Sequence, residues 1–236
     1  MDKVIESEKK TGLENDYKSS CENIYGKYYE ALKYTAEDLE KRLLETGGER
    51  ADRDTWNDEV ECGESGDKIM KLFEHLSIRI KSPDSMLEKL ERRGLSANTY
   101  NALREIHDAI GVRVVCLFVD DVYKVAEMIR GFKGCKVVRE KDYIDKAKPN
   151  GYRSYHMIIE IMEPFLDVDG NNPGKFFAEI QIRTIAMDSW AALEHELKYK
   201  KDIKNEHLIV SELKRCAEEL AACDVSMQTI RNMILR

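Results

Sequence analysis

Two stretches in the C-terminal half of the chain alternate polar and apolar side chains. Successive side chains of a strand point to opposite faces, so residues 151–161 and 176–183, if extended, each bury an apolar face and present a polar one. The polar faces carry Tyr152, Ser154 and His156 in the first stretch, and Glu179, Gln181 and Arg183 in the second. A solvated sheet face rarely needs this mixture of groups. The pattern therefore indicates a functional site on the surface of a sheet.

The rest of the chain divides into helices and strands by the same criteria. Apolar spacing predicts a helical region at 22–44 after a polar start at 1–20, and an acidic, glycine-bearing loop is expected at 47–66. The predicted order is then strand 76–81, helix 83–93, helix 98–107, strand 112–118, helix 121–132 and strand 136–139. The two site strands follow, joined by a turn at 167–174, and then helices at 186–200 and 206–236. This order predicts an α+β fold, a mixed sheet flanked by helices.

Size and composition limit the possibilities. A chain of 236 residues suffices for one well-buried domain with helical additions, and we expect no second catalytic domain. The net charge of -7 argues against a surface built to coat nucleic acid, although a local basic pocket is compatible with it. The charged N-terminus is unlike a signal peptide and no apolar run approaches a membrane span, so we expect a cytoplasmic protein without membrane contact. The six cysteines form no C-x-x-C pair, which favours reduced, mostly buried thiols over disulfides or zinc.

A cationic cluster precedes the predicted site strands in the sequence. Arg79 and Lys81 alternate with isoleucines and therefore share one face of their strand. Ser85 and Lys89 lie four residues apart on the following helix, so they are also neighbours. A cluster of this kind beside a helix N-terminus suits a triphosphate, because free backbone amides add to the cationic side chains. The alternative is a solvated helix with surface ion pairs, for which nearby acidic residues offer partners.

Five motifs together carry a family resemblance. They span residues 75–89, 108–113, 148–156, 177–183 and 188–200, in unbroken order and at compatible spacing. With them the chain resembles the synthetase domain of RelA/SpoT-like enzymes, and most of all the single-domain small alarmone synthetases that make ppGpp and pppGpp. The resemblance implies a nucleotidyltransferase-like fold with N- and C-terminal helical extensions. It also divides the chain into a helical region and acidic loop at 1–66, a synthetase domain at 67–200 and a C-terminal helix at 201–236 that is a candidate oligomerisation element.

The resemblance implies that the enzyme transfers the β,γ-pyrophosphate of ATP to the ribose 3′-hydroxyl of GDP or GTP, giving AMP. Mg²⁺ is the implied cofactor, since this transfer needs a metal to neutralise the triphosphate. Asp108 and Glu179 are the implied metal ligands, and Glu179 also activates the 3′-hydroxyl. By its local sequence alone, Asp108 would be an ordinary turn residue. Its role rests on the complete set of motifs.

The remaining roles follow from the same resemblance. ATP is assigned to Arg79, Lys81, Ser85, Lys89 and Arg113, and the acceptor to Lys141, Lys148, Asn150, Tyr152, His156 and Gln181. The two arginines Arg79 and Arg113 would enclose adenine, and Tyr152 would stack on guanine. Arg183, Glu194 and His195 are expected behind these contacts. Trp190, Leu193 and Leu197 form an apolar stripe on the same helix and are expected in the core.

Two other functions remain open at this stage. One is a catalytically silent module of the same fold that binds guanine nucleotides or single-stranded RNA, and the other is an enzyme that transfers a nucleotidyl group. A decayed synthetase would lose its carboxylates or its Arg79 and Lys81 pair first, and the chain keeps them all. The nucleotidyl transferase does not call for the motif at 151–156. The synthetase is therefore the leading hypothesis.

The chain also departs from the family pattern. Its Ala109-Ile110 pair reverses the usual order, and 139–142 resembles the basic form of a loop that is acidic in some long relatives. The choice between GDP and GTP stays open. Small relatives assemble as homotetramers through terminal helices, and the apolar stripe near the C-terminus permits the same assembly. By the same analogy, ppGpp or pppGpp is a candidate allosteric ligand.

Overall fold

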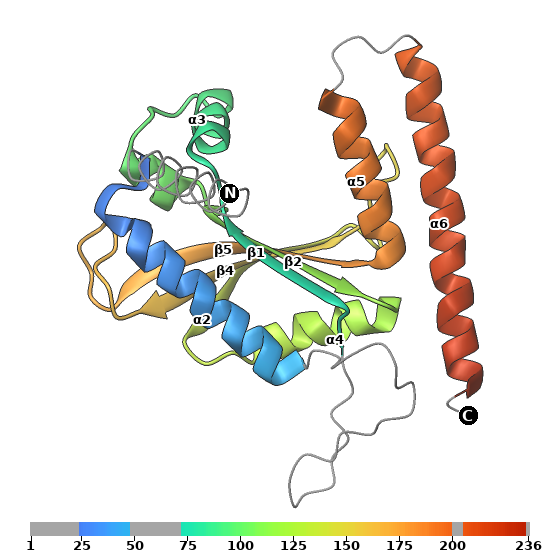
Figure 1. The fold of residues 1–236 in the computed structure, drawn as a ribbon, viewed down its shortest axis with the longest axis horizontal. Helices are drawn as coiled ribbons and strands as arrows, with labels where there is room; N and C mark the ends of the chain where they lie inside the picture. The colour runs from blue at the N-terminus through green and yellow to red at the C-terminus, as the bar shows by residue number, and fades with distance from the viewer. Residues whose placement is uncertain (1–23, 48–71, 200–204, 235–236) are drawn as a thin grey trace, which may run out of the picture.

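The computed structural model describes residues 24–47, 72–199 and 205–234 (Figure 1). The predictions for the polar start at 1–20, and for all but the first residue of the acidic loop at 47–66, fall outside the described residues. None of the described helices combines the length and the apolar composition needed to cross a bilayer.

A five-stranded mixed sheet forms the centre of the structure. Its strands are β1 (His75–Ile80), β2 (Ile110–Cys116), β3 (Cys135–Asp142), β4 (Tyr155–Glu163) and β5 (Gly174–Thr184). They lie in the order β1-β2-β5-β4-β3. Only the β2–β5 pair is parallel, and in its register Gly111 faces Glu179 and Arg113 faces Gln181. The predicted mixed sheet is therefore confirmed.

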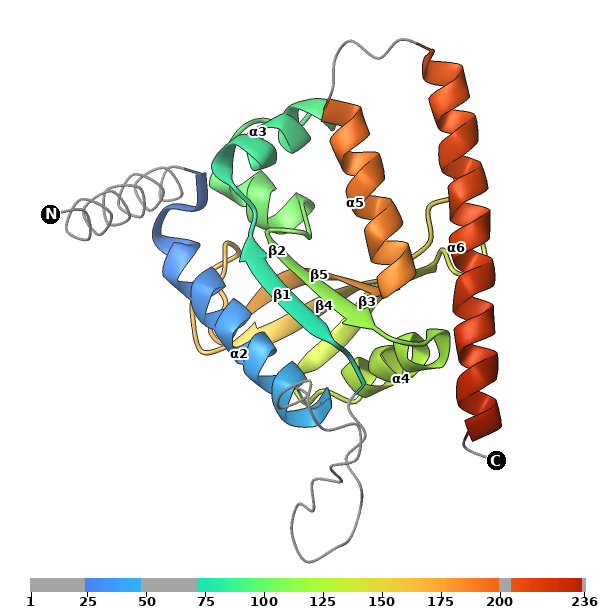
Figure 2. The same ribbon diagram turned by 45° about the vertical axis from the view of Figure 1, so that its right-hand side comes forward.

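Helices cover both faces of this sheet (Figure 1). The helical elements are η1 (Gly26–Tyr28), α2 (Tyr29–Gly47), α3 (Pro83–Arg92), the π-helix η2 (Asn101–Glu105), α4 (Val119–Arg130), α5 (Ile185–Tyr199) and α6 (Glu206–Ile234). The helices α2 and α4 pack on one face, where the side chains of Leu32, Leu39, Val125 and Ile129 join the core. The helices α3 and α5 lie beyond the other face, and α6 runs beside α5 (Figure 2). The face between α3 and α5 is the one that carries Arg79 and Lys81.

Four local predictions need correction. Residues 151–154 precede β4, so Tyr152 lies in a loop, whereas the predicted helix at 98–107 is confirmed as a helical segment at 99–105 that includes the π-helix η2. Strand β3 extends to Asp142, so Lys141 and the presumed loop 139–142 belong to a strand, because they pair with β4. Leu193 is 45% exposed instead of buried, since its face of α5 turns toward a cavity. Among the four cysteines in the described ranges, Cys116 is buried and Cys223 is exposed, so the thiols are not mostly buried.

A tight turn fixes the register of the two site strands. The Asp167 carboxylate accepts hydrogen bonds from the backbone N–H groups of Asp169, Asn171 and Lys175 at 2.9–3.1 Å. Gly174 begins β5 directly against this turn. A Cβ atom added there would lie 2.5 Å from the Phe165 carbonyl oxygen and 2.7 Å from the Asp167 nitrogen. Only glycine allows this close approach.

We expect Gly174→Ala to destabilise the fold by about 1–3 kcal/mol, because the new methyl group meets backbone atoms that cannot move aside independently. The measurement is the free energy of unfolding from urea titration. Gly131→Ala is the matched control, since its nearest new contact is 3.3 Å and its backbone is right-handed. Equal stability of Gly174→Ala and the wild-type protein would contradict the packing of this turn.

Candidate active site

A polar cavity of about 800 Å³ lies over β1, β2 and β5 and is bounded by α5. Ten of the sequence-predicted site residues line it: Arg79, Lys81, Asp108, Arg113, Tyr152, Glu179, Gln181, Arg183, Glu194 and His195. The strands place them there for two reasons. Arg79 and Lys81 alternate along the β1 segment and so share one face, and the β2–β5 register sets Arg113 opposite Gln181. The structure thus brings together most of the residues that the sequence singled out.

Asp108 lines the cavity and holds two lysines, Lys81 from the lining and Lys89 from α3. Lys81 Nζ and Lys89 Nζ each lie 2.5 Å from Asp108 Oδ2. Burial alone would raise the pKa of Asp108, but the hydrogen bonds from Lys81 and Lys89 outweigh it and lower the pKa below its ordinary value. Burial lowers the pKa of Lys81, although Asp108 opposes this shift. The carboxylate is therefore ionised at neutral pH and holds both ammonium groups in place.

The two predicted metal ligands face the same space. Asp108 Oδ1 is buried and has no hydrogen-bond partner among the described residues. Asp108 lies directly before β2, and Glu179 lies on the neighbouring strand β5 opposite Gly111. No group of three or more His, Cys, Asp or Glu side chains suited to a metal occurs in the described part of the chain. Mg²⁺ commonly takes one or two carboxylates and completes its shell with water and substrate phosphates, so the donor set fits this ion.

A chain of hydrogen bonds connects Glu179 to the far side of the cavity. Arg183 Nη2 donates to the Tyr152 hydroxyl at 2.7 Å, and this hydroxyl lies 2.7 Å from His156 Nε2. His156 Nδ1 lies 3.3 Å from Glu179 Oε1. All donors and acceptors match if the neutral imidazole carries its proton on Nδ1. Burial would raise the pKa of Glu179, yet the hydrogen bond from His156 and the positive charge nearby, including that of Lys89, together lower the pKa.

Arg183 also reaches Arg113 through Asp188, a residue that sequence reasoning missed. Arg183 Nη1 lies 3.0 Å from Asp188 Oδ1, and Arg113 Nη1 lies 3.4 Å from the same oxygen. The Asp188 carboxylate on α5 therefore holds one arginine from β2 and one from β5. Asp188 belongs to the fifth motif, but nothing in its local sequence separates it from an ordinary residue in the first turn of a helix.

Three predicted acceptor residues do not line the cavity but contact side chains that do. Lys148 Nζ lies 4.5 Å from the centre of the Tyr152 ring, which is a cation–π distance. Asn150 Nδ2 donates to Glu194 Oε1 at 3.1 Å, and Asn150 Oδ1 accepts from the Tyr152 backbone N–H. His156 does not line the cavity, and it reaches the lining residues Tyr152 and Glu179 through its two ring nitrogens. These contacts hold the Tyr152 ring at the edge of the site.

Two predicted site residues are not brought to the cavity. Ser85 lies in the first turn of α3, where its backbone N–H is bound by the side chain of Ser82, the residue that caps the helix. Lys141 is exposed and pairs with His156 only through the backbone register of β3 and β4. Their assignment to ATP and to the acceptor therefore stays a prediction.

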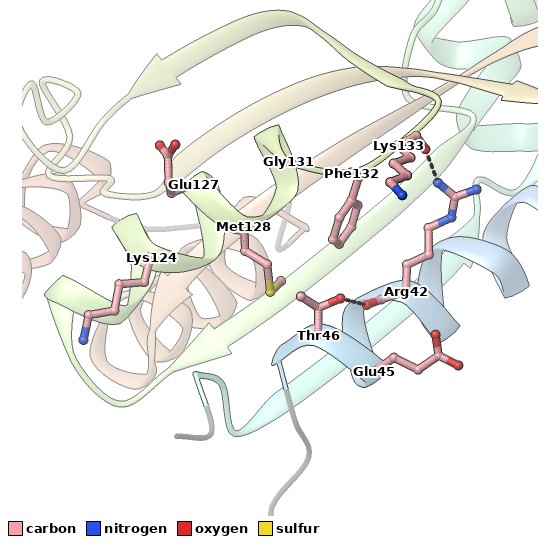
Figure 3. Close-up of a pocket in the computed structure, with 9 residues that line it drawn as sticks. All are labelled: Arg42, Glu45, Thr46, Lys124, Glu127, Met128, Gly131, Phe132 and Lys133. Carbon is pink, nitrogen blue, oxygen red and sulfur yellow. Dashed lines mark hydrogen bonds between the residues drawn. The ribbon is translucent and has the colours of Figure 1, made fainter. Parts of the chain in front are cut away.

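A second large hollow, of about 700 Å³, lies between α2 and α4 (Figure 3). Most of its charged side chains are already paired within the protein. Arg42 donates to the Lys133 carbonyl oxygen at 2.6 Å and pairs with Asp38, while Lys124 pairs with Asp121. No row of converging polar groups comparable to the sheet cavity occurs there, so the sheet cavity is the candidate active site.

The family model described as a region found in RelA / SpoT proteins matches residues 78–204. The chain is 41% identical over 163 residues to GTP pyrophosphokinase YwaC of Bacillus subtilis, which covers 69% of this chain and 75% of the relative. It is 35% identical over 162 residues to GTP pyrophosphokinase YjbM of the same organism, covering 69% and 74%.

Solved structures agree with these relatives. The small alarmone synthetase 1 from Bacillus subtilis, bound to its product pppGpp, matches with a TM-score of 0.66 at 30% identity, over 89% of this chain and 95% of that one. The small alarmone synthetase 2 from the same organism matches with a TM-score of 0.68 at 33% identity, over 86% and 95%. The sequence, the fold and the site thus lead to one result: this chain belongs to the RelA/SpoT family of GTP pyrophosphokinases.

Proposed function

We propose that this protein transfers the β,γ-pyrophosphate of ATP to the ribose 3′-hydroxyl of GDP or GTP and releases AMP. One observation carries this proposal. Asp108 and Glu179 line the same cavity, and Asp108 binds the ammonium groups of Lys81 and Lys89. Carboxylates for a metal and ammonium groups for a triphosphate are what this transfer requires.

On the donor side, Lys81 and Lys89 bind the triphosphate of ATP, and Arg79 and Arg113 hold its adenine. Both arginines line the cavity at its open edge, and Arg113 is about half exposed, at 48% of its side chain. Planar guanidinium groups stack on a base in a way that an ammonium group cannot. Asp108 and Glu179 would hold Mg²⁺, which supplies charge neutralisation at the transferred phosphates.

On the acceptor side, Tyr152 stacks on guanine while Gln181 and His156 contact the nucleotide. The 3′-oxygen attacks the β-phosphorus of ATP, and its proton passes to Glu179. The bond from this phosphorus to the α,β-bridging oxygen breaks, so AMP leaves with that oxygen. The hydrogen bond from His156 favours the ionised form of Glu179, which is the form that binds a metal ion and accepts a proton.

We extend the proposal to the organisation of the protein. Residues 67–200 form the synthetase domain, after a helical region and acidic loop at 1–66, and 201–236 contribute to a homotetramer in the cytoplasm. The apolar side chains of Leu208, Val210, Val225 and Met233 are exposed on α6, which supports an assembly through this helix. Binding of ppGpp or pppGpp at a regulatory site and of single-stranded RNA are further proposals from the same family resemblance.

The direct test is incubation of the purified protein with magnesium, labelled ATP and either GDP or GTP, followed by chromatographic separation of the nucleotides. We expect AMP and a 3′-pyrophosphorylated guanosine nucleotide in equal amounts, and the relative rates rank the acceptors. Nucleotide binding without product, at all magnesium concentrations and with added ppGpp or pppGpp, would favour the silent binding module instead.

Glu179→Gln should lower kcat by about 10²–10⁴-fold, because the amide can neither accept the proton nor offer a charged metal ligand. Binding of GDP measured by calorimetry should stay close to the wild-type value, since the cavity keeps its shape. Glu160→Gln makes the same chemical change on β4, where Glu160 pairs with Lys175 outside the cavity, and should leave kcat unchanged. A fully active Glu179→Gln variant would falsify the proposed mechanism.

Tyr152→Ala should raise KM for GDP and GTP by roughly 5- to 150-fold, which corresponds to about 1–3 kcal/mol of lost base stacking. KM for ATP should change little. Tyr152→Phe is the matched control, because it keeps the ring and removes only the hydroxyl that bonds His156 and Arg183. We expect a normal acceptor KM and a lower kcat for this variant. An equal rise of KM for ATP and acceptor in Tyr152→Ala would exclude the stacking role.

A further inference from the structure

The helix α6 lies directly against the loop that carries Tyr152. We call residues 148–154 the acceptor loop. Its Gly151 has a φ of +93°, and a Cβ atom added there would lie 2.5 Å from Ala217 Cβ and 3.5 Å from Lys214 Cα, both on α6. Trp190 of α5 donates from Nε1 to the Leu213 carbonyl oxygen of α6 at 2.7 Å. The backbone beside Tyr152 therefore rests on a helix that contributes nothing to the cavity wall.

One carboxylate of α6 reaches inward at this contact. Asp224 is 3% exposed, and its Oδ2 accepts a hydrogen bond from Thr184 Oγ1 at 2.8 Å. Thr184 in turn accepts from the Met187 backbone N–H at 3.2 Å, so its hydroxyl caps the start of α5. Thr184 is the last residue of β5 and follows Arg183, which bonds the Tyr152 hydroxyl. Asp224 thus fixes the junction from which Arg183 extends.

The same carboxylate faces the acceptor loop. Asp224 Oδ1 and Arg153 Nε are both buried and have no hydrogen-bond partner among the described residues. Both residues line one small cavity, of about 10 Å³, together with Gly151, Trp190 and Ala217. A space of this size holds about one water molecule, and a water there would accept from Arg153 Nε and donate to Asp224 Oδ1.

The opposite charges of Asp224 and Arg153 also favour this contact. Burial raises the pKa of Asp224, while the hydrogen bond from Thr184 and the charge of Arg153 oppose the rise. Arg153 Nη1 donates to the Ile144 carbonyl oxygen at 2.9 Å, so its guanidinium connects the acceptor loop to the segment before it. A buried carboxylate near a buried guanidinium is stabilised when their remaining polar atoms are satisfied.

We propose that Asp224 is a positioning residue for the acceptor nucleotide, which acts through Arg153 and Thr184 to hold the acceptor loop and the β5–α5 junction against α6. The inference rests on the proposed function only in naming GDP or GTP as the ligand of this loop. Asp224 contacts no substrate. It fixes the position of Tyr152 relative to Arg183, and it reaches the β1, β2 and α3 side of the cavity only indirectly, through Arg183 and Asp188.

The test compares wild type with Asp224→Asn and with Arg153→Gln, which disturbs the same contact from the loop side. KM for GDP and GTP should rise about tenfold in each variant, and KM for ATP should stay within about twofold. The double variant should be no worse than the more affected single one, because both changes interrupt one network. Calorimetric binding of GDP without ATP should weaken by the same factor, and this measurement needs no turnover.

Gln228→Ala is the matched control on the same helix. Gln228 bonds Asp120 at the start of α4, so this variant loosens α6 at a contact remote from the acceptor loop. Its acceptor KM should equal that of the wild type, and the unfolding midpoints of all variants should be measured together. Unchanged KM values in Asp224→Asn, equal losses for ATP and acceptor, or an equal effect of Gln228→Ala would each overturn the proposal. Absence of product in the wild type, combined with weakened GDP binding in Asp224→Asn, would reject the proposed reaction and keep this inference.

Discussion

The parallel pairing of β2 with β5 is the constraint on which the site depends. It is the one parallel pair in an otherwise antiparallel sheet, and its register sets Gly111 opposite Glu179. Asp108, just before β2, therefore faces the same cavity as Glu179 although 71 positions separate them in the sequence. Parallel neighbours need a crossover, and here α4, β3 and β4 form it. Strand β1 then adds its cations on one side of this pair, and β4 adds His156 on the other.

The network around Glu179 shows how the fold keeps so many polar groups ordered. Buried polar atoms are costly unless they are paired, and a fully paired network is rigid. From Arg113 through Asp188, Arg183, Tyr152 and His156 to Glu179, each group contacts the next at 2.7–3.4 Å. The side chains on β2, β4, β5 and α5 that form the site therefore share one set of contacts. Preorganised polar groups of this kind lower the cost of reorganisation during a reaction.

Local periodicity predicted much of this arrangement. The alternation along β1 and β5 correctly placed Arg79 beside Lys81 and Glu179 beside Gln181, because a strand has a fixed repeat of two. Contacts between distant elements could not be predicted in this way. Nothing in the sequence indicated that Asp188 joins two arginines, that Leu193 faces a cavity or that Gly151 rests on Ala217. Such contacts depend on how helices dock on the sheet, which single-sequence patterns do not encode.

The shared position of Lys81 and Lys89 on Asp108 has a consequence for the interval between catalytic cycles. Two ammonium groups held in a partly closed cavity would repel each other and lose hydration, and the single carboxylate oxygen at 2.5 Å from each compensates both. A phosphate chain that reaches these lysines replaces or joins an anion that is already there. If ATP binds these lysines as proposed, its binding exchanges one counterion for another inside the protein. Asp108 would then compensate both lysines again once the phosphates have left.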